Sequence, residues 1–431
     1  MELVLPPSPA SPEEIADALV EQLPENAQLV VPIGNGEPVK LLDAIEERAC
    51  DFKNVTIHQM HALHDRPYLH GAYRGYLNHV SWFLSHITRK AYEAGGCEFA
   101  PANFSEVPLR LLERNPVAVL AAVSPPDRNG HFSLGTSADY ASPMIGRVPF
   151  IVEVNQRMPR TFGENRVRHQ NTLGWCEADY PLVETTANEP SEIDKTIAAL
   201  VAERIGDGST LQLGIGSVPS QVAKLLVDRK DLAIHTELFS DPLVDLIESG
   251  AATGRYKSRS KGRALTTFAL GTQRLYDFLD NNDEVIFVGV NEVNDPRLVG
   301  REPRFASVNA TLQVDLFGQC ASETIGTRYF SGSGGQADFA RGAQYSENGQ
   351  GFIVLPSTTA GGRISRITPT LNSGAVVTTN KNTVDNVVTE FGIAELRGLT
   401  MSQRAHALIA IAHPDHRAWL TREAEANGMI R

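Results

Sequence analysis

The chain has 431 residues, 42% of them hydrophobic, and a formal net charge of -12, so it is long enough for two or three domains with sizeable cores. The acidic balance argues against a general nucleic-acid binder or a membrane-surface binder. Four widely spaced cysteines without a Cys-x-x-Cys pair indicate neither a disulfide framework nor a zinc knuckle, and the lack of a signal-peptide pattern or an apolar run of roughly 18 residues predicts a soluble, cytoplasmic protein.

The first half of the chain begins with a predicted helix over 11–23, because Ser11 followed by proline and two glutamates is a typical capped helix start. A β-α-β unit follows, with a strand, a Gly-x-Gly turn, a helix and a second strand. These elements are expected at 29–33, 34–36, 39–47 and 55–58, and buried strands are expected further on at 117–123 and 150–155.

Residues 58–89 hold six of the twelve histidines, together with several arginines. The spacing of His58, His61 and His64 suggests a zinc site, but no cysteine lies nearby, and steps of three residues on a strand and loop do not hold three imidazoles on one face. Two interpretations stay open: a cationic wall that faces an anionic substrate, and a partly solvated loop with no role.

The polar segment 185–194 precedes a capped helix, so we expect an N-terminal domain over 1–188 and a C-terminal domain over 189–431. The second domain starts with another β-α-β unit, which has strands at 211–213 and 232–234 and a helix over 221–227. Its Gly214-x-Gly216 turn exposes backbone N–H groups that suit an anion. Glu237 follows the second strand, at the edge where open α/β sheets place ligands. Taken alone, the turn and Glu237 fit a tight turn and a solvated strand end at least as well.

The two β-α-β units lie about 180 residues apart along the sequence. This repeat predicts two similar α/β halves. When the two Ile-His pairs are aligned, Met60 occupies the position of Glu237. We therefore expect one half to carry the chemistry and the other to shape the pocket.

Several polar clusters follow in the second half. A basic run over 255–263 fits a solvated loop or a contact for phosphates. Glycine clusters at 331–336 and 357–363 are able to form backbone nests for an oxyanion or a phosphate. Glu390 is a second carboxylate candidate or a structural strand end. The Walker A, G-x-G-x-x-G and G-x-S-x-G patterns are absent from the sequence, which lowers nucleotide-binding and serine hydrolase interpretations.

Several segments of the sequence together carry a family resemblance. In chain order, they are SPPDRNGHFSLGTSADY, EVNQRMPRTFG, LGIGSVP, HTELFSD, NATLQVDLFGQCASETIG, SGSGGQADFARGA, PSTTAGGRISRI, VVTEFGIAELRG and IAHPDHR. On these segments the chain resembles the acetyl-CoA hydrolase/transferase family of CoA-transferases, the group that contains 4-hydroxybutyrate and butyryl-CoA:acetate CoA-transferases. The resemblance covers about residues 120–417, and the first 110 residues depart more from the family pattern.

This resemblance implies two open-sheet α/β domains of the CoA-transferase fold, with the active site in the cleft between them. It implies that Glu237 is the nucleophile that becomes a glutamyl-CoA thioester, that Asn294 holds this carboxylate, and that Gly335 contributes an N–H group to an oxyanion hole. The CoA-contacting positions it implies are Gly214, Ile215, Gly216, Ser217, Val218, Ser331 and Gly334.

The resemblance also implies the reaction, which is transfer of CoA between carboxylic acids. Elementary chemistry agrees with it, because an ionised glutamate attacks a thioester without a separate base. The CoA thioester is then a co-substrate, and we expect no further cofactor, no metal and a homo-oligomeric enzyme. The open alternatives are an acyl-CoA hydrolase that uses the same glutamate and a non-catalytic sensor of CoA or a sugar phosphate.

The acceptor acid is predicted from the histidine- and arginine-rich segment. Arginine binds a carboxylate through two hydrogen bonds, so a wall that contains Met60, Arg66, His70 and Arg74 suits a small dicarboxylate such as succinate or itaconate. Acceptors with one carboxylate, namely 4-hydroxybutyrate, butyrate or acetate, are the alternative.

Overall fold

The computed structural model describes residues 3–186 and 189–431, so the expected boundary at residue 188 lies outside the described residues. The chain forms two compact units. Unit 1 consists of Met1–Thr185, Phe239–Asp241 and Leu265–Val293, and unit 2 of Thr186–Leu238, Pro242–Ala264 and Asn294–Arg431. Two stretches from the second half of the chain therefore belong to the first unit.

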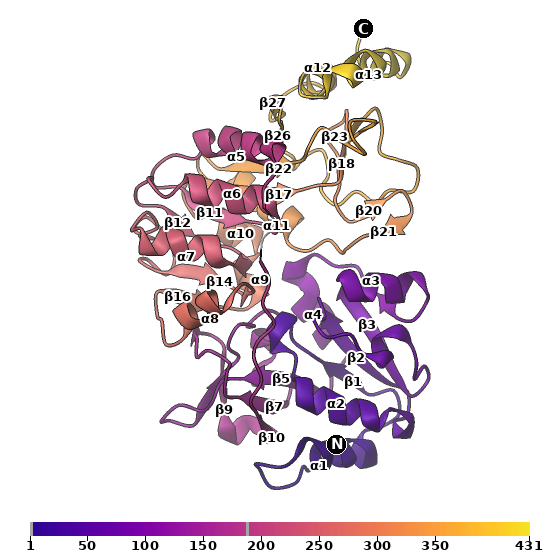
Figure 1. Ribbon diagram of the computed structural model, residues 1–431, viewed down its shortest axis with the longest axis vertical. Helices are drawn as coiled ribbons and strands as arrows, with labels where there is room; N and C mark the ends of the chain where they lie inside the picture. Colours follow the sequence, from indigo (N-terminus) through magenta and orange to yellow (C-terminus); the bar gives the residue numbers. More distant parts are fainter. Residues whose placement is uncertain (1–2, 187–188) are drawn as a thin grey trace. The chain divides into compact units, whose positions relative to one another are not determined.

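Unit 1 is built on a sheet with the strand order β10-β7-β5-β1-β2-β3-β4, in which every pair is parallel (Figure 1). The β5 and β7 strands carry only buried residues, which fits a sheet covered on both faces. In sequence order, the strands are β1 (Gln28–Val30), β2 (Val55–Met60), β3 (Leu77–Phe83), β4 (Glu98–Phe99), β5 (Ala118–Val123), β7 (Phe150–Asn155) and β10 (Thr172–Ala178), and the helices are α1 (Pro12–Gln22), α2 (Val39–Glu47), α3 (His86–Glu93), α4 (Val107–Leu112), α8 (Gln273–Leu279) and α9 (Val290–Val293).

The α1 helix begins as the sequence predicts. The Ser11 hydroxyl accepts a hydrogen bond from the Glu14 amide, and the Glu14 carboxylate accepts one from the Ser11 amide. This capping box satisfies two backbone donors that have no partner inside the helix. Pro12 at the first helical position loses no hydrogen bond there.

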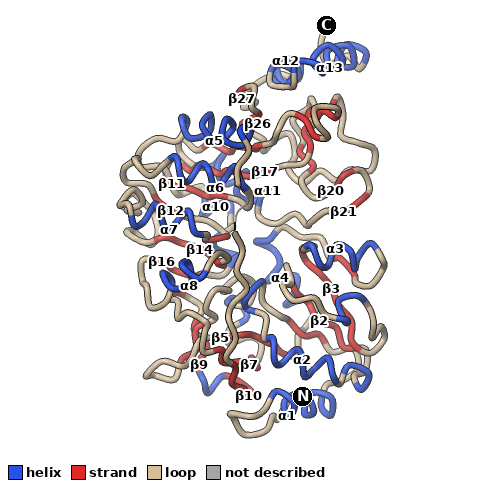
Figure 2. The backbone as a smooth tube through the Cα atoms, viewed as in Figure 1, coloured by secondary structure: helices blue, strands red, loops and turns tan. Residues whose placement is uncertain are grey.

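Unit 2 contains a second sheet, with the order β12-β11-β17-β22-β26-β27, and Figure 2 shows its strands in red among the helices of this unit. Its pairs are parallel except for β26 and β27. Its strands are β11 (Thr210–Leu213), β12 (Ala233–Ile234), β17 (Phe305–Ala310), β22 (Gln350–Val354), β26 (Asn386–Thr389) and β27 (Gly392–Glu395), and the accompanying helices are α5 (Glu192–Arg204), α6 (Ser217–Leu225), α7 (Asp241–Glu248), α10 (Pro296–Val299), α11 (Gln336–Tyr345), α12 (Met401–Ala410) and α13 (Pro414–Ala426).

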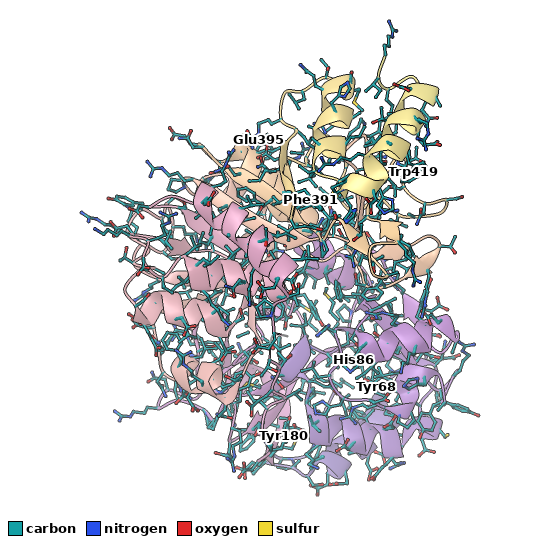
Figure 3. The ribbon with its side chains drawn as sticks, turned by 45° about the horizontal axis from the view of Figure 1, so that its top comes forward. Tyr68, His86, Tyr180, Phe391, Glu395 and Trp419 are labelled. Atoms are coloured by element: carbon teal, nitrogen blue, oxygen red, sulfur yellow. The ribbon has the colours of Figure 1, made fainter. Side chains whose placement is uncertain are left out.

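The last two helices, α12 and α13, pack beside the antiparallel end of this sheet. Trp419 on α13 contacts the apolar cluster that contains Leu396, Leu408 and Leu420. Phe391, in the turn between β26 and β27, packs edge to face against the His413 ring, with 5.4 Å between the ring centroids. Figure 3 labels Phe391 and Trp419. Aromatic and aliphatic burial therefore fixes the end of the chain on unit 2.

The predicted repeat of the β-α-β unit is confirmed. The β1 and β2 strands pair in parallel on either side of α2 in sequence, and β11 and β12 do so around α6. The α6 helix begins at Ser217, four residues earlier than expected, because Pro219 is tolerated in the first turn of a helix. Within the described residues, no helix is long and apolar enough to cross a membrane.

Candidate active site

Glu237 lies three residues beyond the last residue of β12. Because β12 runs parallel to β11, Glu237 and the Gly214-x-Gly216 turn both follow strands at the carboxyl end of the unit 2 sheet. Ligands of open α/β sheets bind at this end. The turn and the carboxylate that the sequence singles out are thus placed on the same edge of the sheet.

The structure brings Glu237, Asn294 and Gly335 together within unit 2. The buried Asn294 side chain donates a hydrogen bond from Nδ2 to Glu237 Oε2 at 2.8 Å. A Cβ atom added to Gly335 would overlap both Glu237 Oε2 and Asn294 Nδ2, so the Gly335 backbone lies directly against the carboxylate and its amide partner. The three residues that the family resemblance singles out as catalytic thus lie in contact with one another.

The surroundings change the acidity of Glu237. Burial disfavours its charged form, and although the Asn294 hydrogen bond acts in the opposite direction, the pKa of Glu237 is raised to about 7. The carboxyl group is then about half ionised at neutral pH. Such a group is a stronger nucleophile when ionised than an ordinary surface glutamate, because it is less solvated.

The glycine turn before α6 is shaped by its neighbours. The Gly214 amide donates to the Val308 carbonyl at 2.9 Å, and a Cβ at Gly214 would lie 2.7 Å from Asn309 Oδ1. Gly216 has a φ of 133°, which side chains rarely tolerate. Ile215 is 62% exposed. The turn therefore presents its backbone and the start of α6, which holds Ser217 and Val218, with little side-chain obstruction.

The second glycine cluster leads into α11, and Gly335 is the residue that caps this helix. Glu323, a buried carboxylate, fixes the preceding loop: its backbone oxygen accepts from the Phe330 and Ser331 amides, and its side chain accepts from Ser333 Oγ. Gly334 takes a φ of 55°. Ser331 and Gly334 thus lie in the loop that leads to Gly335.

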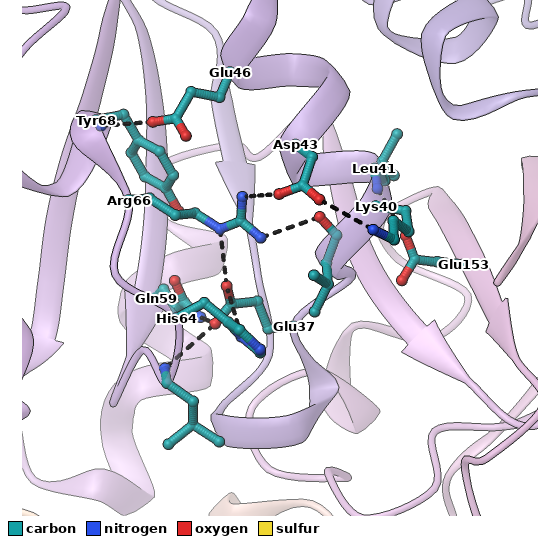
Figure 4. A network of polar contacts seen from close by, with 12 residues as sticks. Glu37, Lys40, Leu41, Asp43, Glu46, Gln59, His64, Arg66, Tyr68 and Glu153 are labelled. Atoms are coloured by element: carbon teal, nitrogen blue, oxygen red, sulfur yellow. Dashed lines mark hydrogen bonds and ion pairs between the residues drawn. The ribbon is translucent and has the colours of Figure 1, made fainter. Parts of the chain in front are cut away.

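The arginines expected to face the substrate have other contacts in the structure. Arg66 is buried in unit 1, where its guanidinium donates to Glu37 Oε1 at 3.1 Å, to Asp43 Oδ1 at 2.6 Å and to the Val39 carbonyl at 3.0 Å (Figure 4). His70 pairs with Asp65, and Arg74 donates to the Gly95 carbonyl.

Two further residues of the histidine-rich segment, Met60 and His58, are buried in unit 1. Met60 is buried at the end of β2, where its amide donates to the Tyr140 hydroxyl at 3.0 Å. His58 is buried in the same strand, and burial lowers its pKa to about 3. Its role is therefore packing within the core of unit 1 as a neutral ring. Among the described residues, no group of three or more His, Cys, Asp or Glu side chains is placed to hold a metal ion.

Comparison with known proteins identifies the family. The family model of the acetyl-CoA hydrolase/transferase N-terminal domain matches residues 10–183, and that of the C-terminal domain matches residues 271–424. The chain belongs to the acetyl-CoA hydrolase/transferase family. This finding confirms the resemblance seen in the sequence and extends it to the N-terminal residues, and it confirms the prediction of an enzyme of the CoA-transferase class.

Relatives in this family share most of their length with the chain. The succinyl-CoA:cyclohexane-1-carboxylate CoA transferase of Geobacter metallireducens is 44% identical over 404 residues, which cover 93% of this chain and 92% of that protein. The 4-hydroxybutyrate coenzyme A transferase of Clostridium kluyveri is 39% identical over 95% and 96% of the two chains. The crystal structure of RipA from Yersinia pestis has a TM-score of 0.91 at 34% identity over 98% of each chain. The predicted CoA-transferase fold is thereby confirmed.

Sequence reasoning missed two buried charged residues of unit 2, Lys257 and Glu302. Lys257 belongs to the basic run over 255–263, yet it is fully buried, and Glu302 is 1% exposed. Periodicity gives no signal for them, because both lie outside helices and strands. Glu390 proves to hold the 357–363 loop, since it accepts hydrogen bonds from the Ser357 amide at 2.9 Å and the Ser357 hydroxyl at 2.6 Å.

Proposed function

We propose that the protein transfers CoA between carboxylic acids by a ping-pong mechanism in which Glu237 forms a glutamyl-CoA thioester. The observation that carries this proposal is the contact of one carboxylate with an amide donor, Asn294, and with a backbone that admits only glycine, Gly335. Family membership supplies the substrate class, and the geometry supplies a nucleophile with a partner that orients it.

In the first half-reaction, the ionised Glu237 carboxylate attacks the thioester carbonyl of an acyl-CoA. The tetrahedral oxyanion requires preorganised N–H donors, and the Gly335 amide is the proposed donor. The C–S bond then breaks, CoA leaves as the thiolate, and the acyl group and Glu237 form a mixed anhydride. The thiolate next attacks the glutamyl carbonyl, which gives the glutamyl-CoA thioester and releases the first carboxylate.

In the second half-reaction, another carboxylate reverses these steps and leaves as the new acyl-CoA. In this proposal, Asn294 keeps its hydrogen bond to Glu237 Oε2 in both half-reactions, which fixes the orientation of the Glu237 side chain. We assign CoA contacts to the turn and helix start at 214–218 and to Ser331 and Gly334, because a glycine turn at a helix N-terminus and a glycine-rich loop suit the phosphates and the amides of CoA.

The acyl donor and the acceptor are the finer part of the proposal. The succinyl-CoA in the name of the Geobacter relative supports a small dicarboxylate such as succinate or itaconate, while the Clostridium relative supports 4-hydroxybutyrate. The contacts of Arg66 with Glu37 and Asp43 give the dicarboxylate no support. A homo-oligomer and a cytoplasmic location stay predictions.

Hydrolysis is the second candidate, since the family includes hydrolases by name. Water in place of the acceptor acid would cleave the same glutamyl-CoA thioester. The two reactions differ in one measurement: a transferase requires an added carboxylate for turnover, whereas a hydrolase releases CoA from acyl-CoA alone.

The decisive test uses the nucleophile. Incubation of the protein with acyl-CoA alone is expected to leave a CoA-sized mass increase on the peptide that contains Glu237. The Glu237→Ala variant should lose both this adduct and the exchange of CoA between acids, while it stays folded by circular dichroism. Full exchange activity in Glu237→Ala would rule out the proposed mechanism.

A further inference from the structure

The strand that precedes Glu237 lies at the edge of its sheet. The β12 strand has only two residues and pairs with β11 on one side, where the Ala233 amide donates to the Ser209 carbonyl and the His235 amide donates to the Leu211 carbonyl, both at 2.9 Å. Backbone groups alternate in direction along a strand. Those of residues 232 and 234 therefore point away from β11.

A loop of unit 2 takes the place of the missing neighbouring strand. The Leu232 amide donates to the Ala251 carbonyl at 2.8 Å, and the Gly254 amide donates to the Leu232 carbonyl at 2.9 Å. The next outward carbonyl, that of Ile234, accepts a hydrogen bond from Lys257 Nζ at 3.0 Å. A side-chain ammonium thus completes the series of hydrogen bonds along the outer edge of β12, three residues before the carboxylate.

The surroundings of Lys257 fix its hydrogen bond to the Ile234 carbonyl. Its side chain is fully buried, and Nζ donates a second hydrogen bond to the Arg263 carbonyl at 3.1 Å. A buried ammonium is costly unless it is hydrogen-bonded and compensated. Burial lowers the pKa of Lys257 to about 8, and the negative charge of Glu302 opposes this shift by favouring the charged form. Because Lys257 is buried, its charge does not contribute to solubility as an exposed basic residue would.

Glu302 fixes the loop and the strand together. It accepts hydrogen bonds from the Ser258 amide at 2.8 Å and the Ser258 hydroxyl at 2.9 Å, directly after Lys257. Its Oε1 also lies 3.9 Å from Nδ1 of His235, the first residue beyond β12. The carboxylate therefore links the two segments on either side of Lys257 Nζ.

We propose that Lys257 is a positioning residue for Glu237. It sets the last hydrogen bond of β12, with Glu302 as its support, and this fixes where the chain leaves the sheet and how Glu237 meets Asn294 and Gly335. The inference rests on the proposed nucleophile. Because displacements of about 1 Å at a reacting group cost up to about 100-fold in rate, the effect belongs to kcat and not to the binding of CoA.

The test compares Lys257→Met with Lys261→Met, which removes an exposed lysine of the same loop. For Lys257→Met we expect kcat and the single-turnover rate of glutamyl-CoA formation to fall at least tenfold per folded molecule, with KM for acyl-CoA within twofold of the wild type. Lys261→Met should match the wild type in both. Lys257→Gln, which keeps a neutral donor near the Ile234 carbonyl, should be intermediate and serves where the Met variant does not fold.

An unchanged rate of thioester formation in folded Lys257→Met or Lys257→Gln overturns the inference. A lower melting temperature with an unchanged rate per folded molecule also overturns it. Glu237→Ala separates this failure from that of the proposed function. If Glu237→Ala is inactive while Lys257→Met reacts like the wild type, only the positioning role is wrong. If Glu237→Ala keeps its exchange activity, the nucleophile itself is wrong.

Discussion

At the scale of single residues, Glu237 combines two properties that oppose each other. Burial raises its pKa to about 7, which makes the ionised form scarcer, while the Asn294 hydrogen bond holds that form in one orientation. A catalytic group with a pKa near the working pH balances reactivity against the population of the reactive state. Burial and the Asn294 hydrogen bond together give Glu237 this balance.

The raised pKa predicts an acidic limb in the rate profile. Attack requires the carboxylate, and the fraction ionised falls about tenfold between pH 8 and pH 6 for a pKa of about 7. We therefore expect kcat/KM for acyl-CoA to fall about tenfold over this range when it is measured under saturating acceptor. A profile that stays flat down to pH 5 would indicate an ordinary glutamate pKa near 4.5.

Thermal unfolding checks the same pKa independently of the chemistry. A carboxyl group whose pKa is raised by folding stabilises the fold below its unfolded pKa, and this contribution is lost as the pH rises through about 7. Glu237→Gln removes the titration. This variant should be more stable than the wild type at pH 8, by at most about 3 kcal/mol, and the difference should shrink toward pH 4.5.

A further prediction concerns Gly335 and depends only on steric overlap. Its φ of -99° is allowed for any residue, but a Cβ would overlap Glu237 Oε2 and Asn294 Nδ2. Gly335→Ala should therefore keep the fold and lower kcat about 100-fold or more, a loss comparable to that of an oxyanion donor. Gly206→Ala is the matched control, since its Cβ would meet open space. Equal activities of the two variants would place Glu237 elsewhere during catalysis.

At the scale of elements, the pattern of the sequence predicts the β-α-β units well. Apolar strands, a Gly-x-Gly turn and an amphipathic helix are local features, and the strands 118–123, 150–155 and 210–213 lie within one residue of the expected ranges. The sequence pattern predicts this helix over 221–227, whereas α6 begins at Ser217, before Pro219. Only the packed structure shows that the helix begins before it.

Elements that depend on distant partners could not be predicted in this way. The β12 strand is two residues long, and its outer edge is completed by residues 251–257, which are irregular. The burial of Lys257 is a tertiary effect, since its neighbours Tyr256 and Ser258 are exposed. Residue type alone therefore favoured a solvated loop. The contact of Asn294 with Glu237 likewise joins residues 57 positions apart, and only the family resemblance indicated it.

At the scale of the whole molecule, the internal repeat explains the architecture of each unit but not which unit carries the carboxylate. Both units contain a sheet that is wholly or mainly parallel and that begins with a β-α-β unit. Unit 2 places a carboxylate after its second strand. In unit 1 the corresponding position is the buried Met60, and the charged residues nearby form an internal network. Residues 265–293 belong to unit 1 although they come late in the chain, which a boundary drawn along the sequence did not show.

This network leads to a prediction that separates stability from substrate choice. Glu37 is 1% exposed, and although burial would raise its pKa, His64 and Arg66 together hold it below the ordinary value. Removing the guanidinium leaves Glu37 buried without the positive charge of Arg66 beside it. Breaking one partner of a buried pair typically costs about 3 to 5 kcal/mol. Arg66→Met should therefore lower the free energy of unfolding by about this amount in urea titrations.

The same variant decides whether Arg66 selects a dicarboxylate. All three described guanidinium contacts of Arg66 lie inside unit 1, so we expect the ratio of kcat/KM for succinate to that for butyrate to stay within twofold of the wild type. Arg74→Ala tests the other predicted arginine, which is exposed and donates to the Gly95 carbonyl, and it should change neither stability nor this ratio. The contrary outcome is a stable Arg66→Met variant in which kcat/KM falls for succinate alone, by about 2 to 4 kcal/mol. This result would assign Arg66 to the substrate site, because a direct ion pair to the second carboxylate is what distinguishes succinate from butyrate.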